Sequence, residues 1–224
     1  MMDFLRGLLP PASDERLNHG PVYLRPPRDG DWQPWSDLRR ESEDFLRPWE
    51  PAWPRDALGR SSFRQRQRHY AEEWRNGTGY SFFIFRADDD ALLGGVSLTN
   101  LRRGVAQCGS LGYWVGQPYA RQGHMTEAIQ CILPFAFGRL SLHRVEAACL
   151  PDNTASRGLL QKCGFCEVGF APKYLKINGV WSDHVLFAML REEMGKAKSS
   201  RQQSETGADA AAEQGFQGFK QAAK

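Results

Sequence analysis

The stretch of residues 111–128 constrains the fold of this chain more than any other part of its sequence. It reads as a strand over residues 111–115, then a loop containing Gly116 and Gly123, then the start of a helix. Such a loop aims several free backbone N–H groups at one point, and the helix dipole adds positive potential there. Gly123 lets a phosphate approach the backbone closely, and Arg121 adds charge at the rim. Taken alone, the segment fits a pyrophosphate site and an ordinary strand-to-helix turn equally well.

The surrounding chain alternates between runs typical of strands and amphipathic runs typical of helices. Helices are expected at residues 29–43, 61–75, 125–137 and 153–163. Strands are expected at residues 22–24, 80–86, 92–101, 107–115, 144–149, 167–176 and 181–190. Asn178-Gly179, between the last two strands, is a strong hairpin signal. This order predicts an α/β (α+β) fold with an antiparallel meander in its middle.

We expect one globular domain over residues 21–195, between two ends of different composition. Residues 1–20 contain a Pro-rich leader, which we interpret as an N-terminal arm. From Lys196 onward the chain is polar or small with almost no large aliphatic residues, so residues 196–224 are expected to be a disordered tail. The whole chain has 224 residues, 41% hydrophobic and 25% charged, which is ordinary globular composition.

Charge and cysteine usage exclude several classes of protein. The net charge of +3 is too small to indicate a direct nucleic-acid binder. No apolar run reaches the ~18 residues of a membrane span, and no signal peptide precedes the five cysteines, so we expect reduced thiols in a cytoplasmic protein without membrane contact. The Cys163–Cys166 pair has no second CxxC or spaced His pair beside it, so no bound metal is expected.

A second motif decides between the two interpretations of the glycine loop. Residues 151–156, Pro-Asp-Asn-Thr-Ala-Ser, lead into a helix that closes with Gly164-Phe165. Asn153 at the strand end, Ser156 three residues later and the Gly-Phe closure resemble the signature of the GCN5-related N-acetyltransferase (GNAT) superfamily. The glycine loop resembles the phosphate-binding Gln/Arg-x-x-Gly-x-Gly/Ala motif of that superfamily.

The loop departs from the superfamily motif at two positions. Ala120 stands where Gln or Arg is usual, and Met125 stands where Gly or Ala is usual. Phosphate binding is expected to survive because backbone amides perform it, and Arg121 is a plausible replacement for the missing side chain.

Three further segments resemble the RimJ/RimL group within the superfamily. They are residues 45–51 (Phe-Leu-Arg-Pro-Trp-Glu-Pro), 123–125 (Gly-His-Met) and 179–185 (Gly-Val-Trp-Ser-Asp-His-Val). That group contains ribosomal-protein alanine and serine N-acetyltransferases, and the match is closer to the RimJ, or alanine, type. The resemblance covers about residues 23–190.

The resemblance implies a GNAT fold with acetyl-coenzyme A as cosubstrate and no metal. The fold has a mixed central sheet of about seven strands, splayed between the fourth and fifth, flanked by about four helices. Coenzyme A enters where these two strands, ending at Val115 and Cys149, move apart. The implied cofactor-binding residues are Tyr113, Trp114, Val115, Ala120, Arg121, Gln122, Gly123, His124, Met125, Thr126 and Asn153.

The resemblance also implies direct attack of an amine on the thioester, with no covalent enzyme intermediate. Val115 N–H is our choice for the oxyanion donor, and Ser156 is the proposed acid for the leaving thiol. The Tyr that many superfamily members use as the acid would stand at position 160, which is Leu160 here. Ser156 could instead be an ordinary residue of the first helical turn, and Asn153 could contact coenzyme A, cap the helix, or do both.

No general base is obvious. Glu50, Asp183 and His184 are candidates through ordered water, and for each we prefer a purely structural role. An α-amino group has a pKa of about 7.7–8.0 against about 10.4 for lysine, so roughly a tenth of an α-amine is already neutral at pH 7. A site with a weak base therefore suits N-terminal amines.

On the acceptor side we expect Trp49, Glu50, Tyr174 and Trp181 to grip the substrate, with a core role for Trp49 and Trp181 as the alternative. The expected function is acetylation of the N-terminal α-amine, alanine in the best-matching relatives, of a protein such as a small-subunit ribosomal protein. Two alternatives stay open: an acetyltransferase for a small amine, and a non-catalytic module that binds coenzyme A or the ribosome. A monomer and a homodimer are both compatible with the sequence.

Overall fold

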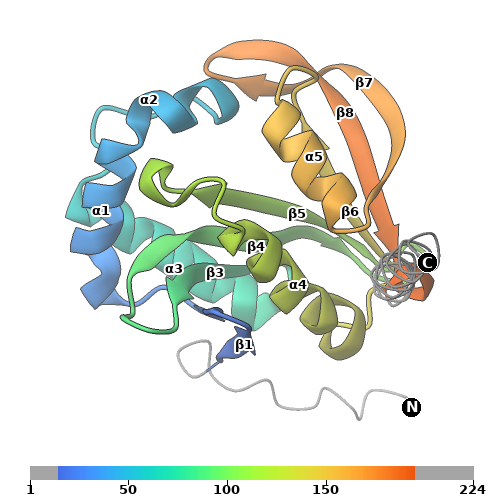
Figure 1. Cartoon of the computed structure of the whole chain (residues 1–224), viewed down its shortest axis with the longest axis horizontal. Helices are drawn as coiled ribbons and strands as arrows, with labels where there is room; N and C mark the ends of the chain where they lie inside the picture. The colour runs from blue at the N-terminus through green and yellow to red at the C-terminus, as the bar shows by residue number, and fades with distance from the viewer. Residues whose placement is uncertain (1–14, 195–224) are drawn as a thin grey trace, which may run out of the picture.

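A computed structural model describes residues 15–194 and arranges them around one eight-stranded sheet (Figure 1). The strand order is β1-β2-β3-β4-β5-β6-β8-β7. The strands are β1 (Leu17–His19), β2 (Val22–Arg25), β3 (Tyr80–Arg86), β4 (Leu92–Arg102), β5 (Cys108–Val115), β6 (Arg144–Cys149), β7 (Cys166–Ile177) and β8 (Val180–Leu190). The tail predicted at residues 196–224 and the first 14 residues of the predicted arm lie outside the described range.

Five α-helices accompany the sheet over the described range: α1 (Trp32–Glu41), α2 (Glu43–Leu46), α3 (Arg60–Asn76), α4 (His124–Pro134) and α5 (Thr154–Lys162). The single helix expected at residues 29–43 is instead a 3-10 turn η1 (Asp29–Asp31), then α1, then α2, followed by a second 3-10 turn η2 (Arg47–Trp49). A further 3-10 turn η3 (Gln117–Tyr119) precedes α4, a π-helical turn η4 (Phe135–Arg139) follows it, and η5 (Arg191–Glu193) follows β8.

The predicted mixed sheet is confirmed, with one strand more than expected. Leu17–His19, which the sequence placed in the N-terminal arm, pairs antiparallel with β2 as strand β1. Only three residues long, this strand is too short to show a recognisable alternation of polar and apolar side chains. The sheet therefore begins before residue 21.

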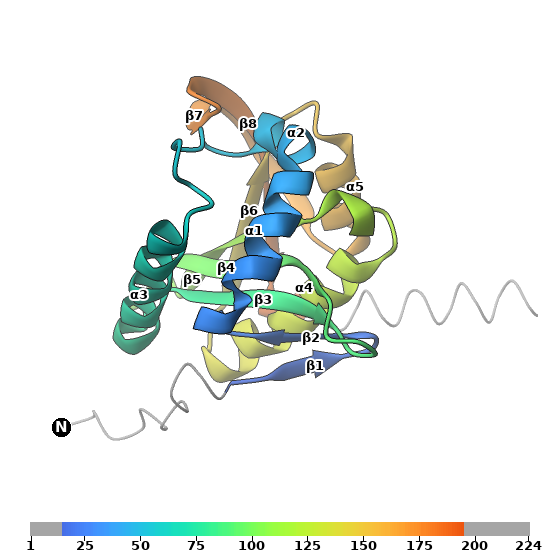
Figure 2. The ribbon, with the colours of Figure 1, turned by 90° about the vertical axis from the view of Figure 1, so that its left-hand side faces the viewer.

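Alternate residues of the central strands pack into two separate cores, one on each face of the sheet. Phe82 and Ile84 of β3 pack with α4 and α5 in the larger core. Phe83 and Phe85 of the same strand pack with α1 and the first half of α3 in the smaller core. Figure 2 shows α1 and α3 in front of and beside the sheet on this second side. We call the first face the α5 face and the second the α1 face.

The strands β5 and β6 run parallel but remain paired for only three residues, Cys108↔Arg144 to Ser110↔Glu146. β5 continues to Val115 and β6 to Cys149 without further pairing between them. The expected splay between the fourth and fifth predicted strands is therefore present, and it opens toward the carboxyl ends of both.

The last two strands form the predicted hairpin. Asn178 and Gly179 at its tip have φ of 44° and 85°, the left-handed pair that a two-residue hairpin turn requires. β8 inserts between β6 and β7, so β7 is the edge strand. In Figure 1 the hairpin curls over the top of the molecule toward α2. The tip is fastened there because the N–H of Asn178 donates to the carbonyl of Glu50 at 2.8 Å.

Within residues 15–194, no helix is both long and apolar enough to cross a membrane. All five cysteines are free thiols, and four of them are buried.

Candidate active site

Backbone groups of β5 face the open gap between β5 and β6. The N–H of Gly116 donates to the carbonyl of Leu93 at 2.9 Å, so Gly116 points its N–H toward β4. Successive N–H groups along a strand alternate in direction, so those of Val115 and Tyr113 point away from β4 and into the gap. β6 does not pair with either residue. These N–H groups are therefore available to a ligand that lies between the splayed strands.

The side chains of β5 divide between the two faces of the sheet. Tyr113 and Val115 pack against the core of the α5 face, whereas Trp114 packs against the core of the α1 face. A ligand in the gap therefore meets Tyr113 from one side and Trp114 from the other. The two sides carry different chemistry.

On the α5 face, the hydroxyl oxygens of Tyr113 and Ser156 lie 2.6 Å apart. Burial raises the pKa of Tyr113 above its ordinary value, and the hydrogen bond with Ser156 opposes this effect only in part. The Ser156 hydroxyl also interacts with the thiol of Cys149 at the end of β6, where burial raises the thiol pKa. Neutral hydroxyls held in a short hydrogen bond can pass a proton from one to the next.

The first turn of α5 places Ser156 in this group. The side-chain oxygen of Asn153 accepts a hydrogen bond from the N–H of Ser156 at 3.0 Å, so Asn153 caps the helix. The capping role foreseen for Asn153 is confirmed. Leu160, in the position of the usual superfamily Tyr, is fully buried in the core and contributes no acid.

The sequence did not identify the hydroxyl of Tyr113, because it placed Tyr113 among residues whose backbone holds the cofactor. A signal was present: Tyr113 shares its strand face with Leu111 and Val115, and this face is covered by helices. Leu160 drew attention to the absence of a Tyr on the helix, although Tyr113 of β5 reaches the hydroxyl of Ser156 in the first turn of that helix.

The start of α4 forms an open N-terminus at the mouth of the gap. Gly123 has φ of 87°, and no atom lies within 4 Å of the Cβ position it lacks. The first helical turn leaves backbone N–H groups without intrahelical partners. The Nδ1 of His124 is buried and has no hydrogen-bond partner among the described residues. A phosphate oxygen would satisfy these donors, so this part of the site fits the diphosphate of coenzyme A.

The other residues predicted for this loop contribute unequally. The N–H of Ala120 donates to the carbonyl of Gln117 at 3.2 Å, and the side chain of Gln122 donates to the carbonyl of Pro118 at 2.7 Å, so both groups brace the loop. Arg121 is exposed with φ of 61°. Met125 and Thr126 are buried, so only their backbone faces a ligand.

On the α1 face, Glu50 lies in an ion pair rather than free in solvent. Its two carboxylate oxygens accept from the guanidinium of Arg39 at 2.8 and 2.5 Å, and the indole N–H of Trp53 donates to one of them at 2.8 Å. The Arg39 guanidinium also lies 4.3 Å from the ring centre of Trp53 and 4.8 Å from that of Trp114. The sequence missed Arg39, which lies on an amphipathic helix and carries no motif.

The remaining acceptor-side residues differ in exposure. Trp181 and Tyr174 on the final hairpin are 56% and 49% exposed, so the core role considered for Trp181 is wrong. Trp49 is half-buried in η2. Tyr174 contacts buried His184 edge-on, with ring centres 5.7 Å apart. The Nδ1 of His184 bonds the carbonyl of Ser182 at 2.9 Å, and Asp183 accepts from the N–H of Lys173 at 2.9 Å, so both candidate bases have structural partners.

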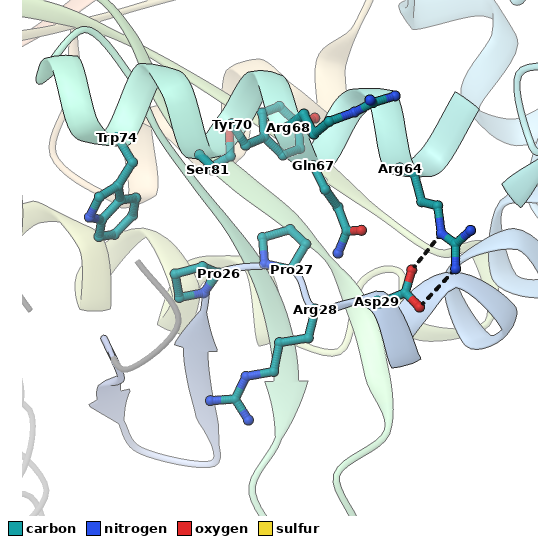
Figure 3. Close-up of a pocket in the computed structure, with 11 residues that line it drawn as sticks. Pro26, Pro27, Arg28, Asp29, Arg64, Gln67, Arg68, Tyr70, Trp74 and Ser81 are labelled. Carbon is teal, nitrogen blue, oxygen red and sulfur yellow. Dashed lines mark hydrogen bonds and ion pairs between the residues drawn. The ribbon is translucent and has the colours of Figure 1, made fainter. Parts of the chain in front are cut away.

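A cavity of about 720 Å³ lies elsewhere, between α3 and residues 26–29 (Figure 3). None of the predicted site residues lines it. Figure 3 shows Arg64 of α3 paired with Asp29 across its edge, at 3.1 Å. Residues 15–194 contain no group of three or more His, Cys, Asp or Glu side chains placed to hold a metal ion.

Comparison with known proteins agrees with this geometry. Residues 22–166 match the acetyltransferase (GNAT) domain family. A probable N-acetyltransferase, YjcK of Bacillus subtilis, is 37% identical over 77% of this chain and 95% of its own length. The ribosomal protein uS5-alanine N-acetyltransferase of Escherichia coli is 32% identical over 78% of this chain and 90% of its own length. The solved structure of Mycobacterium smegmatis RimJ in complex with CoA-disulfide superposes on this chain with a TM-score of 0.75. The match is 33% identical and covers 81% of this chain and 88% of the RimJ chain. The chain therefore belongs to the GNAT acetyltransferase family, and a ribosomal-protein alanine N-acetyltransferase is among its relatives.

Proposed function

We propose that this acetyltransferase moves an acetyl group from acetyl-coenzyme A to the N-terminal α-amine of a protein, with alanine as the preferred first residue. The similarity to the uS5-alanine enzyme over most of both chains supports a ribosomal protein as the acceptor. The RimJ complex with CoA-disulfide supports coenzyme A as the carrier. Within the gap, Val115 N–H is the donor for the oxyanion, and the first turn of α4 binds the diphosphate.

The proton for the leaving group comes from the α5 face. The amine nitrogen forms a bond to the thioester carbon, and the carbon–sulfur bond breaks. The hydroxyl of Ser156 donates its proton to the departing sulfur and receives one from the hydroxyl of Tyr113, 2.6 Å away. The proton released by the amine passes to water and later restores Tyr113. Serine is a weak acid by itself, so a partner that replaces its proton makes this role reasonable.

The observation that carries the choice of amine is the state of Glu50. Both of its oxygens are engaged by Arg39, and one also by Trp53. These contacts hold the carboxylate of Glu50 against Arg39 and Trp53, so it is not placed to take a proton from an acceptor amine. An enzyme without a strong base gains most from an acceptor that is already partly neutral near pH 7, and an α-amine meets this condition far better than a lysine side chain.

The test is steady-state acetylation of matched acceptors with acetyl-coenzyme A. The acceptors are peptides with a free N-terminal Ala or Ser, the same peptides N-blocked but carrying one Lys, and spermidine. Preference for the free Ala peptide is expected. Turnover only with Lys or spermidine would replace the proposal by a small-amine or side-chain acetyltransferase. Tight binding of coenzyme A without transfer to any amine would indicate a non-catalytic binding module.

A further inference from the structure

Arg39 is a buried cation at the junction of the acceptor side and the cofactor strand. The residue is 8% exposed, and its guanidinium pairs with both oxygens of Glu50. Trp53 and Trp114 contribute one indole ring each within 5 Å of the guanidinium carbon. The Nε of Arg39 is buried without a hydrogen-bond partner among the described residues. Arg39 thus touches both the loop that follows η2 and the strand that borders the gap.

The contacts around Arg39 continue to the hairpin and to the phosphate loop. The carbonyl of Glu50 accepts from Asn178 at the hairpin tip, at 2.8 Å. The hydroxyl of Ser42, at the end of α1, accepts from the N–H of Gln117 in η3 at 2.8 Å. Leu38, the residue before Arg39, packs closely on Gly116. A Cβ added to Gly116 would lie 2.3 Å from the Cδ1 of Leu38. The end of α1 is therefore fixed to the strand end, and Arg39 and Glu50 extend this anchor to the hairpin tip.

We propose that Arg39 is a positioning residue, which holds residues 47–53 and the hairpin tip at a fixed distance from the acetyl group and so sets the affinity for the acceptor. This inference rests on the proposed function, because it identifies the acceptor side by that function. Residues 47–53, which include Trp49 and Glu50, are called the acceptor loop below. In this role Arg39 acts through its contacts with Glu50 and Trp53.

The energetics of a buried ion pair favour a role in geometry over a role in stability. Removing two charges from water costs about as much as their attraction returns, and apolar residues of similar volume often stabilise a fold equally well. Here the cost is increased by the unpartnered Nε. The fork of a guanidinium does, however, fix the direction of a carboxylate and stacks on indole rings, which an apolar residue or a lysine does not do.

The experiment compares two adjacent arginines of α1. Arg39→Met removes the buried pair and keeps an unbranched apolar stem. Arg40→Met serves as the matched control: it removes a pair with Asp37 in which both side chains are more than half exposed, and a 3.2 Å hydrogen bond to Ser36, whose hydroxyl keeps its own bond to the carbonyl of Leu58. The double variant Arg39→Met/Glu50→Gln removes both buried charges together. For each protein the KM of the acceptor peptide, the KM of acetyl-coenzyme A, kcat and the amide hydrogen exchange of residues 47–53 and 177–181 are measured.

Arg39→Met and the double variant are expected to raise the peptide KM by about tenfold or more, with the KM of acetyl-coenzyme A within about twofold of wild type. Exchange should accelerate in the acceptor loop and the hairpin tip but not in α4. Arg40→Met should match wild type in every measurement. An unchanged peptide KM in the double variant, or an equal rise in both KM values, would overturn the proposal.

A fallback variant and the hydrogen-exchange measurement keep the role of Arg39 testable if Arg39→Met does not fold or if no peptide is acetylated. If Arg39→Met does not fold, Trp53→Phe removes the indole hydrogen bond to Glu50 and leaves a smaller aromatic ring beside Arg39, and it is expected to raise the peptide KM in the same direction by a smaller factor. Hydrogen exchange needs no acceptor, so it separates the two proposals. Faster exchange in a protein that acetylates no peptide overturns the proposed function alone, whereas unchanged exchange in an active enzyme overturns the role of Arg39 alone.

Discussion

The hydroxyl oxygens of Tyr113 and Ser156 lie 2.6 Å apart, although 43 residues separate them in the chain. One belongs to the strand that borders the gap and the other to the first turn of α5. The contact exists because Asn153 caps α5 and fixes where its first turn begins, and because Tyr113 lies on the strand face that α5 covers. This pair is the chemical centre of the α5 face, and it is the basis of three kinetic predictions.

Replacing Ser156 by Ala should lower kcat about tenfold or more and leave the affinity for coenzyme A nearly unchanged. Alanine removes the hydroxyl but keeps the N–H that Asn153 caps, so α5 should start at the same residue. Steady-state kinetics and calorimetric titration of coenzyme A measure the two effects separately. Unchanged turnover would exclude Ser156 as the acid, and an equal loss of affinity would place it in binding.

Replacing Tyr113 by Phe should also lower kcat by about tenfold or more, since the ring remains and only the replacement proton is lost. If both hydroxyls act in one relay, the double variant should be little worse than the more damaged single variant. A double variant whose loss equals the product of the two single losses would mean that the hydroxyls act independently.

The pH dependence of kcat tests the protonation state of Tyr113. Burial raises its pKa above the ordinary value of 10.0, so the neutral, proton-donating form persists to a higher pH than in a free tyrosine. Wild-type kcat should therefore not fall between about pH 8 and about pH 10 through loss of this proton. The raised pKa of Tyr113 also makes folding stability depend on pH. Its contribution to the free energy of unfolding is complete below about pH 10, the pKa of an unburied tyrosine, and is lost as pH rises through the raised pKa of the folded state.

The informative control for this profile is Tyr113→Phe. A decline of wild-type kcat with a midpoint below about pH 9, absent from Tyr113→Phe, would show that the hydroxyl ionises earlier than its burial implies.

Much of the fold was predictable because the signals that determine it are local. Asn178-Gly179 predicted the final hairpin, and the three strand-like runs at residues 80–86, 92–101 and 107–115, joined by short polar segments, predicted the meander. β1 was missed because a three-residue strand has no readable period. The expected helix ended at Glu43, close to the end of α1, but the short helix α2 after Ser42 was missed; the hydroxyl of Ser42 accepts from the N–H of Gln117, 75 positions away. That contact depends on tertiary packing, which a local pattern does not contain.

The sequence predicted those parts of the candidate site where a motif requires one backbone conformation. Examples are the left-handed Gly123 before α4 and Asn153, which caps α5. The site was not predictable where long-range pairing decides the role of a side chain. The sequence offered Glu50 as a candidate base or substrate contact, whereas in the fold the guanidinium of Arg39 engages both of its oxygens. No local sequence feature of Arg39 or Glu50 indicates that the two side chains form an ion pair. No motif in this chain identifies the first residue of the acceptor protein, so the choice of alanine rests on similarity to relatives.

The conformation of the phosphate loop can be tested with two glycines that differ in one respect. No atom lies within 4 Å of the Cβ position of Gly123 or of Gly158, so alanine fits sterically at both. Gly123 has φ of 87°, a left-handed conformation that costs an alanine about 1–2 kcal/mol, whereas Gly158 lies inside α5 with an ordinary helical φ. Gly123→Ala should therefore lower the free energy of unfolding by about 1 kcal/mol or more, and Gly158→Ala should raise it by about 0.5–1 kcal/mol. The same two variants test coenzyme A binding. Because the left-handed conformation of Gly123 directs the first N–H groups of α4, Gly123→Ala should weaken coenzyme A binding by roughly tenfold, or about 1.4 kcal/mol, and Gly158→Ala should not. Urea denaturation measures the free energy of unfolding, and calorimetric titration measures the affinity for coenzyme A on the same samples. Unaltered coenzyme A affinity in Gly123→Ala, with the expected loss of stability, would show that the diphosphate is held by groups other than the start of α4.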